Sequence, residues 1–273
     1  MSLDFDITDK AKLEETREET HKAVQLLSMV PRCLLEPDPT DASASLNWDK
    51  KLQMLASQEV HGIVAGFEFA DQILCLAREG TAIERIQTVG NTYEQLFQKL
   101  KNALTDHGLN GEALRMDLPY DLPGPVERRG APFQQQDPGA LNVLSSLFSF
   151  TSSVLQNIFA PVEEASAVTC WPHHYDLATL LTLVPDEDFE KTKSIGFGFS
   201  PGDGNYDEPY FYLTPWPYPA THQLYTLKPP AFWNTEGWVG GVLKAADLKA
   251  YDAKQVVIDY FKEGFDKLKV IYE

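Results

Sequence analysis

The chain of 273 residues has only three cysteines, Cys33, Cys75 and Cys170, which lie far apart and include no C-x-x-C pair. This spacing argues against a disulfide framework and a zinc knuckle, and it is typical of reduced thiols in a cytoplasmic protein. The first residues, MSLDFDITDK, are acidic rather than apolar, and no run of 18 apolar residues occurs. The sequence therefore predicts neither a signal peptide nor a membrane span.

Positive charge is also scarce. The chain has 40 acidic residues against 23 lysines and arginines, which gives a formal net charge of −17 that both halves share. Because a uniformly acidic surface repels phosphate backbones and anionic lipid, we expect neither nucleic-acid nor membrane binding. No arginine follows Arg129. The second half therefore lacks a guanidinium group for bidentate contact with a phosphate or carboxylate.

Several common catalytic signatures are missing. The sequence contains no G-x-S-x-G, no H-E-x-x-H, no phosphate-binding P-loop and no G-x-G-x-x-G. It therefore does not point to the hydrolase, metalloprotease or nucleotide-binding classes that these motifs mark. It names no cofactor, and it leaves the oligomeric state and the question of enzymatic activity open.

The sequence does contain the pattern of a globular protein. Its hydrophobic content of 43% and aromatic content of 11% suffice for a substantial core. Apolar residues at helical spacing predict four helices, over residues 9–30, 91–108, 140–159 and 252–273. Alternating apolar residues predict strands, among them 46–54, 63–69, 170–182 and 195–199. Pro31 is expected to lie at or just beyond the end of the first helix. The fold class that follows is α+β.

The two halves of the chain resemble each other. Each has a helix and then a strand that begins with tryptophan. A strand that reads G-F-x-F from Gly66 or Gly196 follows, then one more strand and a terminal amphipathic helix. We therefore predict two similar helix–antiparallel sheet–helix units, residues 1–117 and 138–273, packed as one body. Residues 118–137, rich in Pro, Gly and Gln, are expected to connect them. Chance similarity between amphipathic strands is the alternative.

Several short motifs follow one another along nearly the whole chain. They are Thr20-His21, Asn47-Trp48, GFEFAD, YDLA, GFGFSPGDG, PYFY and PYP. In this order they resemble a widespread bacterial and plant family that shares a domain of unknown function. The resemblance implies no particular chemistry, because no activity is established for that family. Small residues usually precede its F-D-L-A strand, whereas His173 and His174 stand here, so a dihistidine site would not be common to the family.

The segment CWPHHYDLATLLTL brings two histidines and an aspartate to the start of an apolar run. In a strand, Trp171 and His173 would share one face, and His174 and Asp176 the other. This geometry argues against one metal site that uses both histidines. It favours His174 as a general base that the Asp176 carboxylate orients. The alternative is a hydrogen-bonded pair that only fixes the start of the strand.

The segment SPGDGNYDEPYFY partly matches a calcium-binding loop. Asp203, Asn205 and Asp207 occupy its first three ligand positions. Glu208 and Thr214, however, stand where such a loop needs glycine and a bidentate glutamate. We therefore interpret the segment as a hairpin turn, with a calcium site as the alternative.

Aromatic residues concentrate between the prolines of residues 206–238. Because proline cannot donate to a central strand, much of this segment is expected to be irregular and to form either a pocket wall or a packed cap. Our hypothesis is a small-molecule pocket near the strand from Trp171 to Asp176. The binding residues that we expect are His21, Trp48, Trp171, His173, Asp203, Tyr210, Tyr212 and Trp216.

Two other functions stay open at this point. One is a metal-assisted hydrolase in which His21, either His173 or His174, and a carboxylate hold the metal. The other is a non-enzymatic interaction module in which the aromatic and proline-rich segment binds a partner protein.

Overall fold

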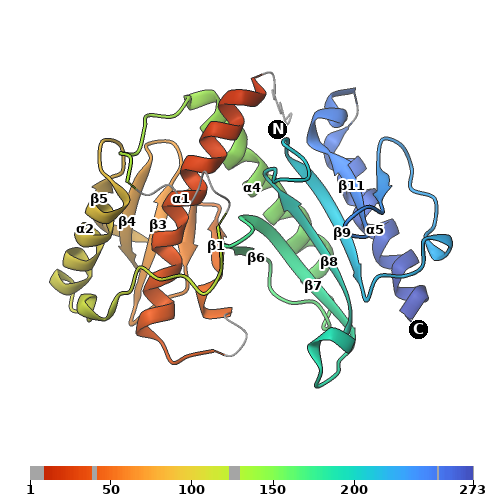
Figure 1. The fold of residues 1–273 in the computed structure, drawn as a ribbon, viewed down its shortest axis with the longest axis horizontal. Helices are drawn as coiled ribbons and strands as arrows, with labels where there is room; N and C mark the ends of the chain where they lie inside the picture. Colours follow the sequence, from red (N-terminus) through yellow and green to blue (C-terminus); the bar gives the residue numbers. More distant parts are fainter. Residues whose placement is uncertain (1–8, 39–41, 123–129, 251, 273) are drawn as a thin grey trace. The chain divides into compact units, whose positions relative to one another are not determined.

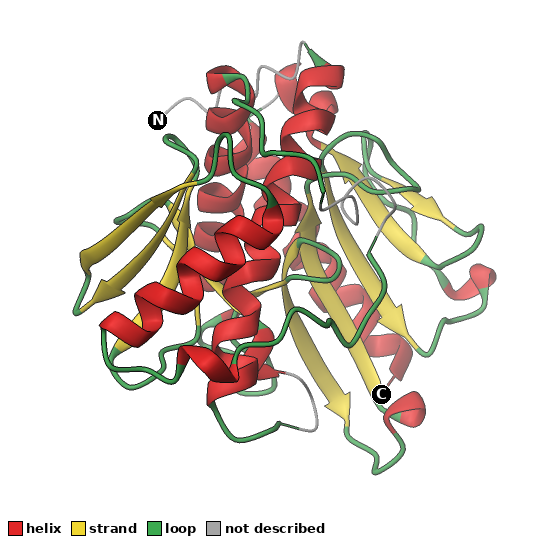
Figure 2. Cartoon of the chain, turned by 60° about the vertical axis from the view of Figure 1, so that its left-hand side comes forward, coloured by secondary structure: helices red, strands yellow, loops and turns green. Residues whose placement is uncertain are grey.

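The structure is a computed structural model that describes residues 9–38, 42–122, 130–250 and 252–272. These residues contain four α-helices and antiparallel strands, which confirms the α+β class (Figures 1 and 2). None of the described helices is both long enough and apolar enough to cross a membrane. The chain divides into two compact units. We call residues 9–145 and 170–175 the amino-terminal unit, and residues 146–169 and 176–272 the carboxy-terminal unit.

These units do not have the predicted boundaries at residues 117 and 138. The last residues of the predicted connector belong to the amino-terminal unit because their backbone pairs within it. Gln136 N–H donates to the side chain of Gln72 over 2.8 Å, and Phe133 N–H donates to the Asn91 carbonyl over 2.9 Å. Residues 123–129 of the predicted connector and residues 1–8 of the predicted first unit lie outside the described residues.

Helix α1 (Lys10–Leu34) begins at Asp9, whose carboxylate accepts the Lys12 N–H over 3.2 Å. It continues through Pro31, so the prediction that Pro31 ends the helix is wrong. Proline removes one N–H donor but keeps its carbonyl, which here accepts the Leu35 N–H over 2.9 Å. The helix packs on β2 and β3 of its own unit.

The sheet of the amino-terminal unit is an antiparallel meander, and Cys170 of β6 (Thr169–Trp171) pairs with Leu46 on its β1 side. Its strands are β1 (Leu46–Asp49), β2 (Met54–Ser57), β3 (Ile63–Glu68), β4 (Ile73–Arg78) and β5 (Thr81–Gln87). The single strand predicted over 46–54 is therefore wrong. The chain turns after β1, with Gln53 in the left-handed region at φ 51°, so the apolar alternation crosses a turn.

Helix α2 (Tyr93–Asp106) contacts β5. A capping box holds its first turn: the Thr92 hydroxyl accepts the Gln95 N–H over 3.3 Å, and the Gln95 side chain accepts the Thr92 N–H over 2.8 Å. The helix therefore begins two residues after the start of the predicted range 91–108.

The sheet of the carboxy-terminal unit is also antiparallel, with strand order β10–β11–β9–β8–β7. Its strands are β7 (Asp176–Val184), β8 (Lys193–Ser200), β9 (Tyr210–Trp216), β10 (Phe232–Asn234) and β11 (Gly240–Lys244). Short 3₁₀ helices in the two units cover Ala42–Ala44, Gly111–Ala113, Phe189–Lys191, Thr221–Gln223 and Ala245–Ala250.

Two helices cover one face of this second sheet. They are α5 (Ala253–Tyr272) and the part of α4 (Pro138–Phe159) that belongs to the unit (Figure 1). The Phe197 ring on β8 lies 4.6 Å from Phe159 of α4 and 6.1 Å from Phe261 of α5. Phe199, two residues along β8, meets Phe148 of α4 at 5.6 Å. The phenylalanines of the GFGF motif therefore form the centre of this core.

Gly198, the second glycine of that motif, leaves space for a side chain on the opposite face of the sheet. A Cβ atom at Gly198 would lie 2.5 Å from the Tyr212 ring and 2.9 Å from Ala178, whereas one at Gly196 would meet no atom closer than 3.9 Å. Gly198 thus allows Tyr212 to lie across β8 toward β7. This close approach accounts for one of the two glycines.

Candidate functional site

The strand predicted over 170–182 is interrupted by a turn. Residues 172–175, which we call the histidine turn, separate β6 from β7. The Tyr175 N–H donates to the Trp171 carbonyl over 2.7 Å, and Tyr175 has a left-handed φ of 57°. Strand alternation therefore does not apply to the two histidines. Instead of pointing to opposite faces, the rings of His173 and His174 lie 4.1 Å apart.

Helix α1 holds the histidine turn through the Pro172 carbonyl. This oxygen receives hydrogen bonds from His21 Nε2 and from Gln25 Nε2, each over 2.7 Å. Because a carbonyl only accepts, His21 carries its proton on Nε2. The Tyr120 hydroxyl donates to Gln25 Oε1 over 2.8 Å. Both ends of the Gln25 amide are thereby used, and the backbone of the turn is fixed within its unit.

Tyr175 anchors the other end of the turn. Its buried ring stacks on His21, with 4.9 Å between centroids and 7° between planes. Its hydroxyl donates to Thr20 Oγ1 over 2.9 Å, and Thr20 donates to the Thr16 carbonyl over 2.8 Å. The roles of Tyr175, Thr20 and Gln25 were not predicted. The signal in the sequence is the row of polar residues on the otherwise apolar face of the first helix.

His21 is neutral in the folded protein. Its side chain is buried, with 6% of the residue exposed, and this burial lowers its pKa to about 4. The hydrogen bond to Pro172 acts in the opposite direction, and the nearby Arg17 charge adds to the lowering. A buried imidazole with its Nε2 proton committed to a carbonyl is a structural group.

This buried histidine predicts acid sensitivity. In the unfolded chain its pKa is close to 6.5, so between pH 6.5 and pH 4 the unfolded state binds a proton that the folded state does not. The stability contributed by neutral His21 is therefore complete above pH 6.5 and is lost as the pH falls. When the pH falls from 7 to 4.5, the free energy of unfolding of the wild type should drop by about 2 kcal/mol more than that of His21→Gln, a variant that keeps an N–H donor.

Urea unfolding of both proteins at the two pH values measures this difference. His222→Gln is the matched control, because His222 is exposed in the 3₁₀ helix before β10. It should show the wild-type loss of stability. An equal loss in His21→Gln and in the wild type would contradict the prediction.

His173 differs from His21 because it is only half-buried. Burial, followed by the neighbouring His174, lowers its pKa to about 4. Its ring lies 5.3 Å from Tyr120 and 6.1 Å from Trp171, in addition to the contact with His174. We call Tyr120, Trp171, His173 and His174 the ring cluster. Only His174 is exposed, and the other three members are half-buried.

The proposed catalytic partner of His174 lies in the other unit. Asp176 is the first residue of β7, and its Oδ2 accepts a hydrogen bond from the Tyr212 hydroxyl. The orientation of His174 by Asp176 therefore stays a prediction.

Asp203 closes a turn, as the sequence indicated. Its Oδ1 accepts the N–H groups of Asn205 and Tyr206 over 2.7 and 3.0 Å. Its Oδ2 accepts the Tyr210 hydroxyl over 2.6 Å, and burial raises the pKa of that hydroxyl. Both carboxylate oxygens therefore bind groups of the same loop and strand, which supports the hairpin interpretation.

The remaining predicted residues are dispersed. Trp48 is buried on β1, with its ring 5.6 Å from Phe69. Trp216 ends β9, where its indole N–H donates to the Glu190 carbonyl over 3.1 Å and its ring meets Tyr218 at 5.0 Å. His21, Trp48, Trp171, His173 and His174 belong to the amino-terminal unit, whereas Asp176, Asp203, Tyr210, Tyr212 and Trp216 belong to the carboxy-terminal unit.

The metal-site alternative gains no support from the geometry. Within the described ranges, no group of three or more His, Cys, Asp or Glu side chains could hold a metal ion. His21, its first expected ligand, already donates from Nε2 to the Pro172 carbonyl.

The ring cluster and the histidine turn bring together three predicted site residues, Trp171, His173 and His174, with Tyr120 and Tyr175, which were not predicted. The family resemblance drawn from motifs such as YDLA stays a prediction. Comparisons of the chain with protein-family models, with curated proteins and with solved structures gave no match.

Proposed function

We propose that the protein binds a small planar molecule at the ring cluster of the amino-terminal unit. The observation that carries this proposal is the position of His173, whose half-buried imidazole lies within 6.1 Å of three other rings. Aromatic faces favour stacking with a flat guest, and a partly exposed imidazole adds directional polar contacts.

The protonation state of His173 favours a particular kind of ligand edge. With a pKa of about 4, its ring is neutral at pH 7. A neutral imidazole offers one N–H donor and one acceptor nitrogen. It therefore matches a planar group that also carries both, such as a carboxamide or a nitrogen heterocycle. The net charge of −17 opposes an anionic ligand.

The support beneath the cluster favours binding without large rearrangement. His21, Gln25 and Tyr175 hold the histidine turn by hydrogen bonds and by ring stacking. Side chains that are held before the ligand arrives lose less conformational entropy on binding. Two members of the cluster, His173 and His174, lie on this anchored turn.

The same pKa favours binding over catalysis by His173. A group with a pKa of about 4 is a weak base at pH 7, where an efficient general base has a pKa near the working pH. The enzymatic version assigns the base to His174 instead. Separate replacement of His174 and of Asp176 tests this enzymatic version, which requires each of the two variants to lose an activity that the wild type has.

The proposal is tested with two carboxamides of similar size. Nicotinamide has a flat aromatic ring, and cyclohexanecarboxamide has a puckered ring that cannot stack. In protein-observed NMR at pH 7, nicotinamide should cause saturable shifts of the Trp171 indole and His173 ring signals. Cyclohexanecarboxamide should bind more weakly. His173→Ala should weaken nicotinamide binding about fivefold, the effect of losing one ring contact.

His222→Ala serves as the control variant, since His222 is exposed and lies in the other unit. It should leave nicotinamide binding unchanged. The proposal fails if neither amide shifts the Trp171 and His173 signals, or if the two amides bind equally well.

A further inference from the structure

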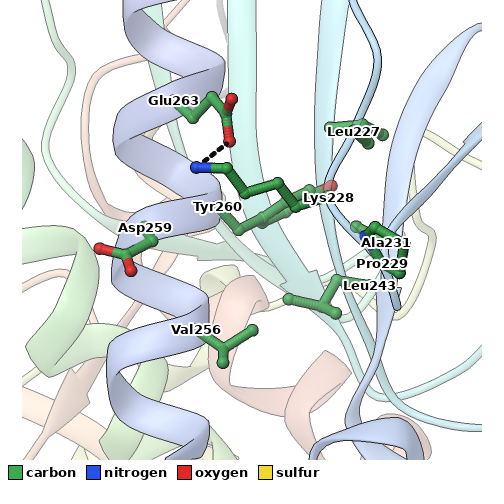
Figure 3. Close-up of a pocket in the computed structure, with 9 residues that line it drawn as sticks. All are labelled: Leu227, Lys228, Pro229, Ala231, Leu243, Val256, Asp259, Tyr260 and Glu263. Atoms are coloured by element: carbon green, nitrogen blue, oxygen red, sulfur yellow. Dashed lines mark ion pairs between the residues drawn. The ribbon is translucent and has the colours of Figure 1, made fainter.

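A second candidate site lies wholly within the carboxy-terminal unit. A cavity of about 120 Å³ opens between α5 and the segment that leads into β10 (Figure 3). Its lining includes apolar side chains on both walls and charged side chains from the loop and the helix. The lining residues are Leu227, Lys228, Pro229, Ala231, Leu243, Val256, Asp259, Tyr260 and Glu263.

The apolar lining limits the size of a guest. Leu227, Leu243 and the ring of Tyr260 are buried, and Val256 is half-buried. A cavity of this volume is slightly smaller than the apolar cavities that hold benzene, so it accommodates a body of about five carbon atoms. Transfer of such a body from water is the main favourable contribution expected here.

The chain places its own alkylammonium group at this cavity. Lys228 extends from the loop to α5, where its Nζ lies 3.2 Å from Glu263 Oε2 (Figure 3). The Lys228 side chain is 76% exposed, and that of Glu263 is 24% exposed. Because exposed ion pairs contribute little stability, another cation can replace Lys228 on Glu263 at small cost.

We propose that this cavity binds a primary alkylamine. Its alkyl chain packs against Leu243 and Val256, and its ammonium group replaces that of Lys228 on Glu263. Asp259, one helical turn earlier, is also part of the lining, but its Oδ1 accepts the Gln255 side-chain N–H over 2.7 Å and its carboxylate points away from Lys228 (Figure 3), so Glu263 is the carboxylate that binds the ammonium. The lining therefore has two acids for one lysine in a chain of net charge −17, which opposes an anionic guest.

Three probes with the same branched body separate charge from shape. Isoamylamine is cationic at pH 7, isoamyl alcohol is neutral and isovalerate is anionic. Protein-observed NMR at low ionic strength should show saturable shifts around Tyr260 and Glu263 for the amine. The alcohol should bind more weakly than the amine, and isovalerate should not bind.

Two variants test the displacement of Lys228. Lys228→Gln should tighten amine binding about two- to fivefold, the factor that corresponds to an exposed ion pair. Glu263→Gln should weaken it by at least a similar factor. Lys262→Gln is the matched control, because Lys262 is exposed on the same helix and does not line the cavity. Thermal unfolding of each variant verifies that it is folded.

The proposal is overturned if isoamylamine does not bind, if the amine and the alcohol bind equally, or if neither variant changes amine binding. It does not depend on the ring cluster, so a negative result with nicotinamide leaves it intact.

Discussion

Glu19→Gln should destabilise the protein by about 3 kcal/mol, because it breaks an ion pair on α1 in which the Lys22 side chain is 6% exposed and the Glu19 side chain 15% exposed. Glu19 Oε2 accepts from Lys22 Nζ over 2.9 Å, and Glu19 Oε1 accepts the Gln134 N–H over 2.8 Å. The Lys22 ammonium lies 4.1 Å from the centre of the Phe133 ring. Removal of the carboxylate charge leaves this ammonium desolvated without its counter-charge.

The same helix offers a matched control. Glu14 pairs with Arg17 over 3.3 Å at the same i,i+3 spacing, and the Arg17 side chain is also largely buried, at 10% exposed, but the Glu14 side chain is 48% exposed, so water already screens this carboxylate. Glu14→Gln should therefore cost less than about 0.5 kcal/mol. Urea unfolding at pH 7 measures both variants. Lys22→Met added to Glu19→Gln should recover part of the loss, and equal effects of the two glutamate changes would show that burial is not the cause.

Phe197→Ala should cost about 3–5 kcal/mol, the range found when a buried phenylalanine is removed from a core. Phe197 is fully buried beneath α4 and α5, with the Phe159 ring 4.6 Å away. Its strand, β8, is hydrogen-bonded to β7 and β9 on its two sides, so the backbone cannot move inward to fill the space. The variant is therefore expected to retain most of the cavity volume.

Phe232→Ala is the comparison within the same unit. Phe232 lies on the short strand β10 and is 37% exposed, so its truncation should cost less than about 1 kcal/mol. Calorimetric unfolding of both variants at one pH gives the comparison. A loss at Phe232 as large as that at Phe197 would contradict the assignment of the core.

The regular elements of this fold were predictable where side-chain periodicity is strong. Apolar residues at helical spacing predicted α2 and α5, and the observed ends of both helices differ from the predicted ones by at most two residues. Strand β5 was not predicted, because most of its residues are exposed and it shows no apolar alternation. Strand β10 has only three residues, too few to establish a period of two.

The candidate site was predictable in its residue types but not in its geometry. The sequence drew attention to His173 and His174, yet it placed them on opposite faces of a strand. Pro172, which cannot donate within a strand, was the available signal for a turn. The left-handed backbone of Tyr175 left no signal, because tyrosine rarely adopts it. The bond between His21 and Pro172 joins residues 151 positions apart, which no local pattern reveals.

The two hydrogen bonds received by the Pro172 carbonyl also bear on how the chain folds during synthesis. The amino-terminal unit is discontinuous, because residues 170–175 complete a body that otherwise ends at residue 145. Until the ribosome has released these residues, His21 and Gln25 lack their acceptor, and Leu46 lacks its partner Cys170. A nascent or truncated chain that stops at residue 145 would present β1 as an open sheet edge, the kind of surface at which aggregation begins.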